Sequence, residues 1–188
     1  MTRPTSLCCT GCGWVPPPTE LVPFRCAAAR PGDDIDHVLG RVLDPSRLAF
    51  PDREEPNPFL AYRELLHSHG VALAGGLSDE AYVEMVRELD NAVAEVDGRG
   101  FTVTPFRREP SLWAALGLSD KGGVWVKDET GNVSGSHKAR HLFGVLVWLE
   151  VAKRAGLADP SRPRELAIAS CGNAALAAAV VAAAGGRG

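Results

Sequence analysis

Residues 174–184 are eleven alanine, leucine and valine residues in a row, without a single polar side chain, and Gly185-Gly186 follows them as a helix stop. A helix that is apolar on every side must be buried on every side. We therefore expect these residues to form a core helix of a larger α/β domain. On this expectation the 188 residues are an N-terminal fragment or a truncated product, and the chain that would cover the helix lies beyond Gly188.

The elements predicted before this helix alternate between strand and helix. Residues 124–127 predict a strand, a helix is expected from about residue 137 to 155, and residues 166–169 predict a second, buried strand. The order βαβα is typical of a parallel sheet with helices across it. Because two parallel strands are too few for a stable sheet, the expected fold class is α/β with a partial, open parallel βαβα sheet.

Composition divides the chain into three expected parts. Residues 1–56 hold most of the fourteen prolines and predict an irregular arm, because proline lacks the amide donor of regular elements. Residues 57–98 predict two amphipathic helices, the first capped by Asn57 and running from Phe59 to His69, with core-packing apolar faces and no chemistry of their own. Residues 99–188 form the N-terminal part of the α/β domain.

Charge and cysteine usage exclude several classes of protein. The formal net charge of −3 offers no general basic surface, so neither nucleic acid nor an anionic membrane is an expected partner. The sequence has no run of about 18 apolar residues, so we expect no membrane span. The N-terminus has no apolar segment typical of a secretory signal. Four of the five cysteines lie unevenly within the first 26 residues, which is not a disulfide framework and indicates a cytoplasmic protein.

Two loops are expected at the carboxyl ends of the strands, where open α/β sheets bind ligands. The first, residues 131–138, has neither the Walker spacing nor a GxGxxG pattern, and it places Lys138 in the first turn of a helix. The positive end of the helix dipole opposes a cation there and favours the neutral amine, which is the form that reacts with an aldehyde cofactor. By itself, however, a lysine in such a loop is more often a solvated surface residue. The second loop, residues 170–173, precedes the apolar helix.

The two loops share their motifs with a known family. Lys127-Asp128-Glu129, then SGSHKAR at residues 134–140, then SCGNA at residues 170–174 resembles the fold type II pyridoxal-phosphate enzymes. That group contains threonine synthase, serine/threonine dehydratase, cysteine synthase and the tryptophan synthase β-chain. Thr104-Pro105 extends the similarity, which covers about residues 102–188.

The resemblance implies pyridoxal 5'-phosphate as the cofactor and Lys138 as the catalytic lysine that binds it. It also implies that Asn173 contacts the phenolic oxygen of the cofactor, and that Ser170, Gly172 and Asn173 receive the carboxylate of the substrate. An anion at the start of the following helix would meet free amides and the positive end of the dipole. The glycine-rich phosphate loop of the family would fall beyond Gly188.

The expected function is that of a lyase or synthase acting on a small hydroxy- or phospho-amino acid, by an elimination similar to that of threonine synthase or an ammonia-lyase. The full-length form is expected to be a homodimer. Two alternatives stay open. One is a β-replacement enzyme similar to cysteine synthase. The other, from a different class, is a catalytically inactive remnant or binding module that works through its cysteines.

The N-terminal cysteines resemble half of a zinc ribbon. Residues 9–13 are a C-x-x-C-G knuckle, and a structural zinc site of this kind needs two knuckles. The second would begin at Cys26, but Ala29 stands at the position of its partner, and neither Cys8 nor His37 has the required spacing. The segment is similar to a degraded form of the N-terminal extension of some threonine synthases. We therefore assign no metal ligand here and expect Cys8, Cys9, Cys12 and Cys26 to be free cysteines, with bound zinc as the alternative that stays open.

Overall fold

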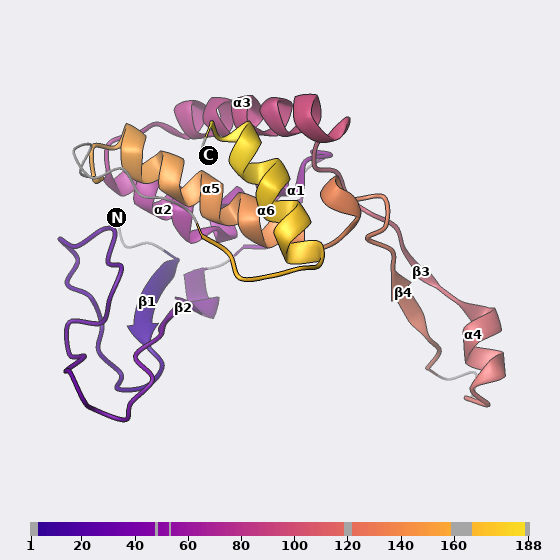
Figure 1. The fold of residues 1–188 in the computed structure, drawn as a ribbon, viewed down its shortest axis with the longest axis horizontal. Coiled ribbons are helices and arrows are strands. Elements are labelled where there is room, and N and C mark those ends of the chain that lie inside the picture. Colours follow the sequence, from indigo (N-terminus) through magenta and orange to yellow (C-terminus); the bar gives the residue numbers. More distant parts are fainter. Residues whose placement is uncertain (1–3, 48, 53, 119–121, 159–166, 187–188) are drawn as a thin grey trace. The chain divides into compact units, whose positions relative to one another are not determined.

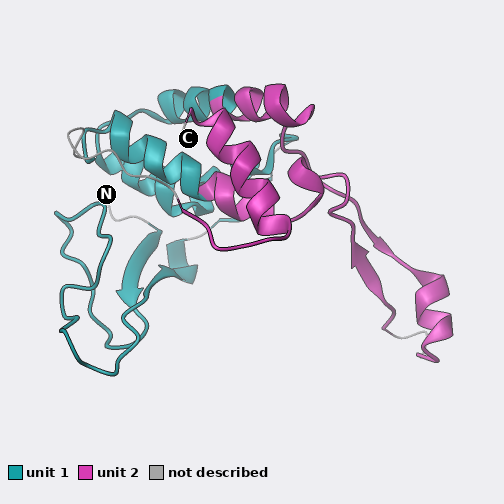
Figure 2. Ribbon diagram, viewed as in Figure 1, with its two compact units in different colours: residues 1–88, 145–164 teal, residues 89–144, 165–188 magenta. Residues whose placement is uncertain are grey.

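The computed structural model describes residues 4–47, 49–52, 54–118, 122–158 and 167–186. Two compact units divide the chain, residues 1–88 with 145–164 and residues 89–144 with 165–188 (Figure 2). The strands and helices are shown in Figure 1 and are, in chain order, β1 Thr5–Cys9, β2 Leu39–Leu43, η1 Pro45–Arg47, α1 Pro58–Ala61, η2 Arg63–Leu65, α2 His67–Ala74, α3 Asp79–Asp97, β3 Phe106–Arg108, α4 Pro110–Ala115, β4 Trp125–Lys127, η3 Val133–Gly135, α5 Lys138–Arg154 and α6 Asn173–Ala184.

The N-terminal arm contains more regular structure than its prolines predict. β1 and β2 pair antiparallel, in a register that runs from Thr5 opposite Leu43 to Cys9 opposite Leu39. Residues 10–38 connect them without a helix or strand. Thr5 is buried and its hydroxyl lies 3.0 Å from Nδ1 of His67, on α2. The two ends of the arm thus form a small antiparallel sheet, and the connection between them has neither helix nor strand.

The first predicted helix is interrupted. Asn57 is the cap that the sequence predicts, since its side-chain oxygen accepts a hydrogen bond of 2.8 Å from the amide of Phe59. However, α1 ends at Ala61, and the backbone is extended at Leu66 before α2 begins. A single helix from Phe59 to His69 was therefore the wrong expectation, because the extended conformation of one residue breaks the helical hydrogen-bond ladder.

The second predicted helix is confirmed as α3. Ser78 precedes it, and the hydroxyl of Ser78 accepts a hydrogen bond of 3.1 Å from the backbone amide of Ala81. Gly98 follows the helix with a φ of +79°, a conformation that favours glycine. The apolar stripe predicted on this helix is buried, except that Val96 is exposed. The buried members of the stripe are Tyr82, Met85, Val86, Leu89 and Val93. α5 has a comparable stripe, made of Ala139, Phe143, Leu146, Val147 and Val151. Each large apolar side chain buried in this way contributes about 1.5–3 kcal/mol.

The motif-bearing part combines helices with a small sheet, as expected of part of an α/β enzyme, but its strands pair differently. β4 confirms the strand predicted at residues 124–127, and it pairs antiparallel with β3, not in parallel with a later strand. Of the second predicted strand, Leu166 lies outside the described residues, and residues 167–169 are exposed without strand structure. A parallel strand must be covered on both faces, and Ile168 is 45% exposed, so this condition is not met here.

The apolar run forms α6, but the helix is buried on one side only. Ala177, Val180 and Val181 are buried, whereas Leu176 is 55% exposed. Within its unit, α6 packs against η3. Burial on every side is therefore not observed in the described chain. In the same described residues, every helix is too short or too polar to cross a membrane.

Candidate functional site

Lys138 is the first residue of α5 and follows the short helix η3 by three positions. Its side chain is exposed. In the part of the chain that the structure describes, its amine takes part in no salt bridge and no side-chain hydrogen bond. The predicted catalytic lysine therefore has a free amine at the start of a helix.

The backbone before Lys138 adopts an unusual conformation. Ser134 has φ 53° and ψ 20°, the left-handed region that residues other than glycine rarely occupy. Such a conformation costs about 1–3 kcal/mol, and strain of this kind is common at functional sites. Two hydrogen bonds hold the turn in place. The amide of Ser134 donates to Oδ2 of Asp97 at 3.1 Å, and Nδ2 of Asn132 donates to the carbonyl of Ser136 at 2.8 Å.

Three buried polar atoms in the same turn have no hydrogen-bond partner among the described residues. They are Oδ1 of Asn132, Oγ of Ser134 and Oγ of Ser136. An unsatisfied buried polar group costs about 1–3 kcal/mol, and native structures keep few of them. Three within five residues, directly before a free lysine, indicate that this turn can accept hydrogen bonds from, or donate them to, a polar ligand.

A polar network connects three of the sequence motifs. Oε2 of Glu129 accepts a hydrogen bond of 2.9 Å from Nε of Arg140, and its Oε1 accepts one of 2.5 Å from the hydroxyl of Thr104. Nζ of Lys127 donates to the carbonyl of Thr104 at 2.6 Å. Burial raises the pKa of Glu129, but the hydrogen bonds from Arg140 and Thr104 and the charge of Arg140 outweigh it and lower the pKa.

This network is the part of the site that sequence reasoning left without a role. The four residues belong to the segments that carry the family resemblance, but only their order along the chain could be read from the sequence. The structure shows that they connect the TP segment, the K-D-E segment and the first turn of α5 to one another. Arg140 lies two residues after Lys138, so the network holds the turn that presents the lysine.

The second loop is exposed throughout. Asn173 is the first residue of α6, Gly172 is its N-cap residue, and no side chain caps the helix. The amide of Gly172 lies 3.4 Å from the hydroxyl of Ser170, to which it donates. Among the described residues, no hydrogen bond or ion pair joins Lys138 to this loop. The structure therefore presents the two predicted halves of the site on α5 and α6 without joining their side chains.

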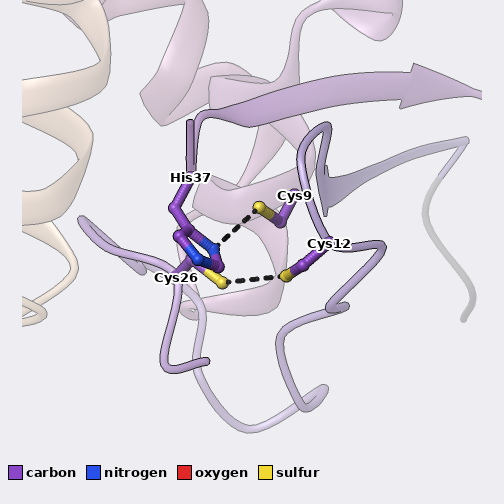
Figure 3. A group of neighbouring side chains, drawn as sticks. All are labelled: Cys9, Cys12, Cys26 and His37. Atoms are coloured by element: carbon purple, nitrogen blue, oxygen red, sulfur yellow. Dashed lines mark hydrogen bonds between the residues drawn. The ribbon is translucent and has the colours of Figure 1, made fainter. Parts of the chain in front are cut away.

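Four side chains converge in the N-terminal arm (Figure 3). Cys9 ends β1, Cys12 follows it in a turn, Cys26 lies in the long connection, and His37 lies just before β2. Sγ of Cys9 is 3.5 Å from Nδ1 of His37, and Sγ of Cys12 is 3.5 Å from Sγ of Cys26. The potential ligand atoms of all four lie within 4.8 Å of one another. Cys8 is outside the cluster.

The pKa values of the two buried thiols in this cluster are shifted in opposite directions. Burial opposes ionisation of Cys9, but hydrogen bonds from the backbone N–H groups of Cys12 and Gly11 lower its pKa to about 6. Burial raises the pKa of Cys26 to about 11, and the neighbouring thiols act in the same direction. Sequence spacing had left His37 outside any knuckle. The sequence places a carboxylate, Asp33, four residues before His37, and in the structure Oδ2 of Asp33 lies 3.1 Å from Nε2 of His37. A carboxylate near a histidine is the feature that could have marked His37 as a candidate ligand.

Comparison with known proteins assigns one part of the chain. Residues 99–187 match the family model described as pyridoxal-phosphate dependent enzyme. The match contains Lys138, the polar network and the loop before α6, and it leaves out the arm with its cysteines. No curated protein and no solved structure matches the chain.

Proposed function

From the match of residues 99–187 to the family model described as pyridoxal-phosphate dependent enzyme, we propose that Lys138 is the lysine through which the protein holds its cofactor. When bound, pyridoxal 5'-phosphate supplies an electron sink that stabilises negative charge on the Cα atom of an amino-acid substrate. The residues present fit such a group. The observation that carries the proposal is the free amine of Lys138, placed directly after a turn with three unsatisfied buried polar atoms.

The first role proposed for Lys138 is to hold the cofactor through its amine. Its second role is to take the proton from Cα of the substrate on Nζ and to return it, or deliver it to the leaving group, later in the reaction. A lysine held in an ion pair would have to break that pair before its amine could reach the cofactor. The exposed, unpaired state of the Lys138 side chain supports both roles.

For the second loop we propose binding roles. The uncapped start of α6 offers backbone N–H groups and the positive end of a helix dipole to an anion. Gly172 and Ser170 would receive the carboxylate of the substrate there. The amide of Asn173 would donate a hydrogen bond to an oxygen of the cofactor. The polar network of Glu129 and Arg140 would orient the first turn of α5.

The proposed reaction is an elimination from a small hydroxy- or phospho-amino acid, similar to that of threonine synthase or an ammonia-lyase, by a homodimeric cytoplasmic enzyme. The motif resemblance supports this choice. A β-replacement similar to that of cysteine synthase would use the same lysine and the same loop. The ammonia-lyase reaction and the β-replacement are distinguished by their products, since elimination from serine or threonine releases ammonia and a 2-oxo acid, whereas replacement retains the amino group. A reaction like that of threonine synthase also retains the amino group and is recognised by the phosphate that it releases from a phospho-amino acid.

Borohydride trapping tests the assignment of Lys138. The purified protein is incubated with pyridoxal 5'-phosphate, reduced with borohydride and digested for peptide mass spectrometry. We expect the adduct on Lys138 and its loss in Lys138→Ala. Lys153→Ala is the matched control, because Lys153 is an exposed lysine on the same helix. An adduct that persists in Lys138→Ala at the wild-type level, or that lies on another lysine, would contradict the proposal.

A further inference from the structure

We infer that the N-terminal arm binds one structural zinc ion through four side chains: Cys9, Cys12, Cys26 and His37. This function lies outside the segment that matches the enzyme family, and it does not depend on the role of Lys138. Thiolate sulfur and imidazole nitrogen are the ligands that zinc prefers, and four protein ligands make a closed, structural site.

The spacing of the ligand atoms suits a tetrahedral ion. Sulfur ligands at about 2.3 Å and a nitrogen ligand at about 2.0 Å from zinc lie roughly 3.5–3.8 Å apart from one another. The two observed separations, from Cys9 to His37 and from Cys12 to Cys26, are both 3.5 Å. The full set spans no more than 4.8 Å, so small rotations of the side chains would complete the tetrahedron.

The turn between the first two cysteines has the geometry of a metal knuckle. The amide of Gly13 donates to the carbonyl of Cys9 at 2.8 Å, and Gly13 has a φ of +77°, which explains the glycine after the second cysteine. This turn would hold the sulfurs of Cys9 and Cys12 on one side of the knuckle without any rearrangement of the backbone.

Backbone contacts bring the histidine to this knuckle from far along the chain. The amide of Thr10 donates to the carbonyl of Val38 at 2.8 Å. Gly11 lies so close to the carbonyl of Asp36 that a Cβ atom there would collide with it. A glycine is therefore required where the segment before β2 passes the knuckle. This close approach brings His37 beside the knuckle, so that Cys26 and His37 take the place of the second C-x-x-C pair that the sequence lacks.

The orientation of His37 is determined by a carboxylate. Its Nε2 lies 3.1 Å from Oδ2 of Asp33. The carboxylate of Asp33 also accepts hydrogen bonds from the backbone amides of Arg30 and Ile35, at 2.9 and 3.3 Å. Nδ1 is thereby directed at Cys9. Zinc-binding histidines usually donate their second ring N–H to a carboxylate or carbonyl, which selects the tautomer that binds the metal.

The arm needs a cross-link because it has almost no apolar core. Throughout residues 10–38, Pro23 and Cys26 are the buried residues. A connection of this length without helix or strand is uncommon in a compact domain, and small regions of this kind are usually stabilised by a metal or by disulfides. Cys12 and Cys26 are free cysteines in the structure. A zinc ion would join the beginning, the middle and the end of the connection at one point.

Metal analysis of the full chain tests this inference. The protein is purified under reducing conditions and its zinc content is measured by mass spectrometry of the element. We expect one zinc per chain in the wild type and a loss of at least tenfold in Cys12→Ser and in His37→Ala, at the same free zinc concentration. Cys8→Ser is the matched control, because Cys8 is adjacent to Cys9 but outside the cluster. Lys138→Ala should keep its zinc.

Cobalt substitution keeps the test informative if a variant does not fold. Wild-type protein reconstituted with Co²⁺ should show the d–d bands of a tetrahedral centre and a thiolate charge-transfer band. His37→Cys should retain a tetrahedral centre with an altered spectrum. A folded wild type without zinc, a disulfide between Cys12 and Cys26, equal metal loss in Cys8→Ser, or an unchanged cobalt spectrum in His37→Ala would each overturn the inference.

Discussion

The arm and the α5 region show opposite relations between motif and geometry. In residues 99–187 the motifs that carry the family resemblance follow one another along the chain, yet Lys138 and the loop before α6 are exposed, and no hydrogen bond or ion pair joins them among the described residues. In the arm the zinc-ribbon pattern is incomplete, yet four potential ligands converge. A sequence motif therefore indicates candidate residues for a site. Whether their side chains lie close together depends on which segments the fold brings into contact.

The two regions also differ in what holds them. α3 and α5 each bury a continuous apolar stripe, whereas the connection between β1 and β2 buries few residues and brings four potential metal ligands together with the end of β1. We expect the first region to respond to changes in packing and the second to respond to the metal. The following predictions test that division, from the largest expected effect to the smallest.

Removal of the side chain of Phe143 should give the largest effect. Phe143 is fully buried and its ring centroid lies 4.6 Å from that of Phe101. Phe143→Ala should lower the free energy of unfolding by about 3–5 kcal/mol, because it removes apolar burial and leaves a cavity. Val15→Ala, at a 58% exposed position of the arm, should change it by less than about 0.5 kcal/mol. Equal effects in denaturant titrations would contradict the comparison.

Removal of zinc should act on the arm alone. At free zinc about 100-fold above its dissociation constant, the bound ion stabilises the folded arm by about 2.7 kcal/mol, and a chelator abolishes this contribution. In hydrogen exchange, the amides of β1 and β2 should then lose protection while those of α3 keep theirs. The control is the same chelator on Cys12→Ser, which should change nothing further. Loss of protection in α3 would show that the two regions are not stabilised separately.

Neutralising Glu129 should have a smaller, pH-dependent effect. Glu129→Gln removes the charged partner of Arg140 and should cost about 1.5 kcal/mol at neutral pH. Because the pKa of Glu129 is lowered in the folded protein, its ionised form stabilises the fold above the unfolded-state pKa of about 4.5. That stabilisation is lost as the pH falls through the lower folded-state pKa. The difference between wild type and variant should therefore shrink in acid. A difference that does not depend on pH would argue against an ionised Glu129.

Local patterns predicted much of the helical structure. The spacing of apolar residues along residues 79–97 and 138–154, with glycine after each helix, determines α3 and α5, because a helix is built from contacts three and four residues apart. Asn57 before a proline predicted a cap for the same local reason. The identity of Lys138 as the candidate lysine likewise followed from neighbouring residues. These features need no information from distant parts of the chain.

Pairing between distant segments was not predictable in the same way. β4 has the composition of a strand, but only the fold decides that its partner is β3 and that the pair is antiparallel. The contact of Glu129 with Arg140 and Thr104 also requires three segments to meet. Apolar composition alone overstated the burial of α6, since burial depends on what lies against a helix as well as on its own side chains.

The sequence by itself predicted α3, α5 and α6 and identified Lys138 as the candidate lysine, because each prediction depends on residues close together along the chain. Only the tertiary structure decided that His37 meets Cys9, Cys12 and Cys26. That meeting depends on the register of β1 against β2, which places Cys9 opposite Leu39, two residues after His37. The side chains of Cys9 and His37, 28 residues apart along the chain, then lie 3.5 Å from each other. Backbone hydrogen bonds between strands can form in several registers, and the register that also places four ligands together is a property of the folded arm.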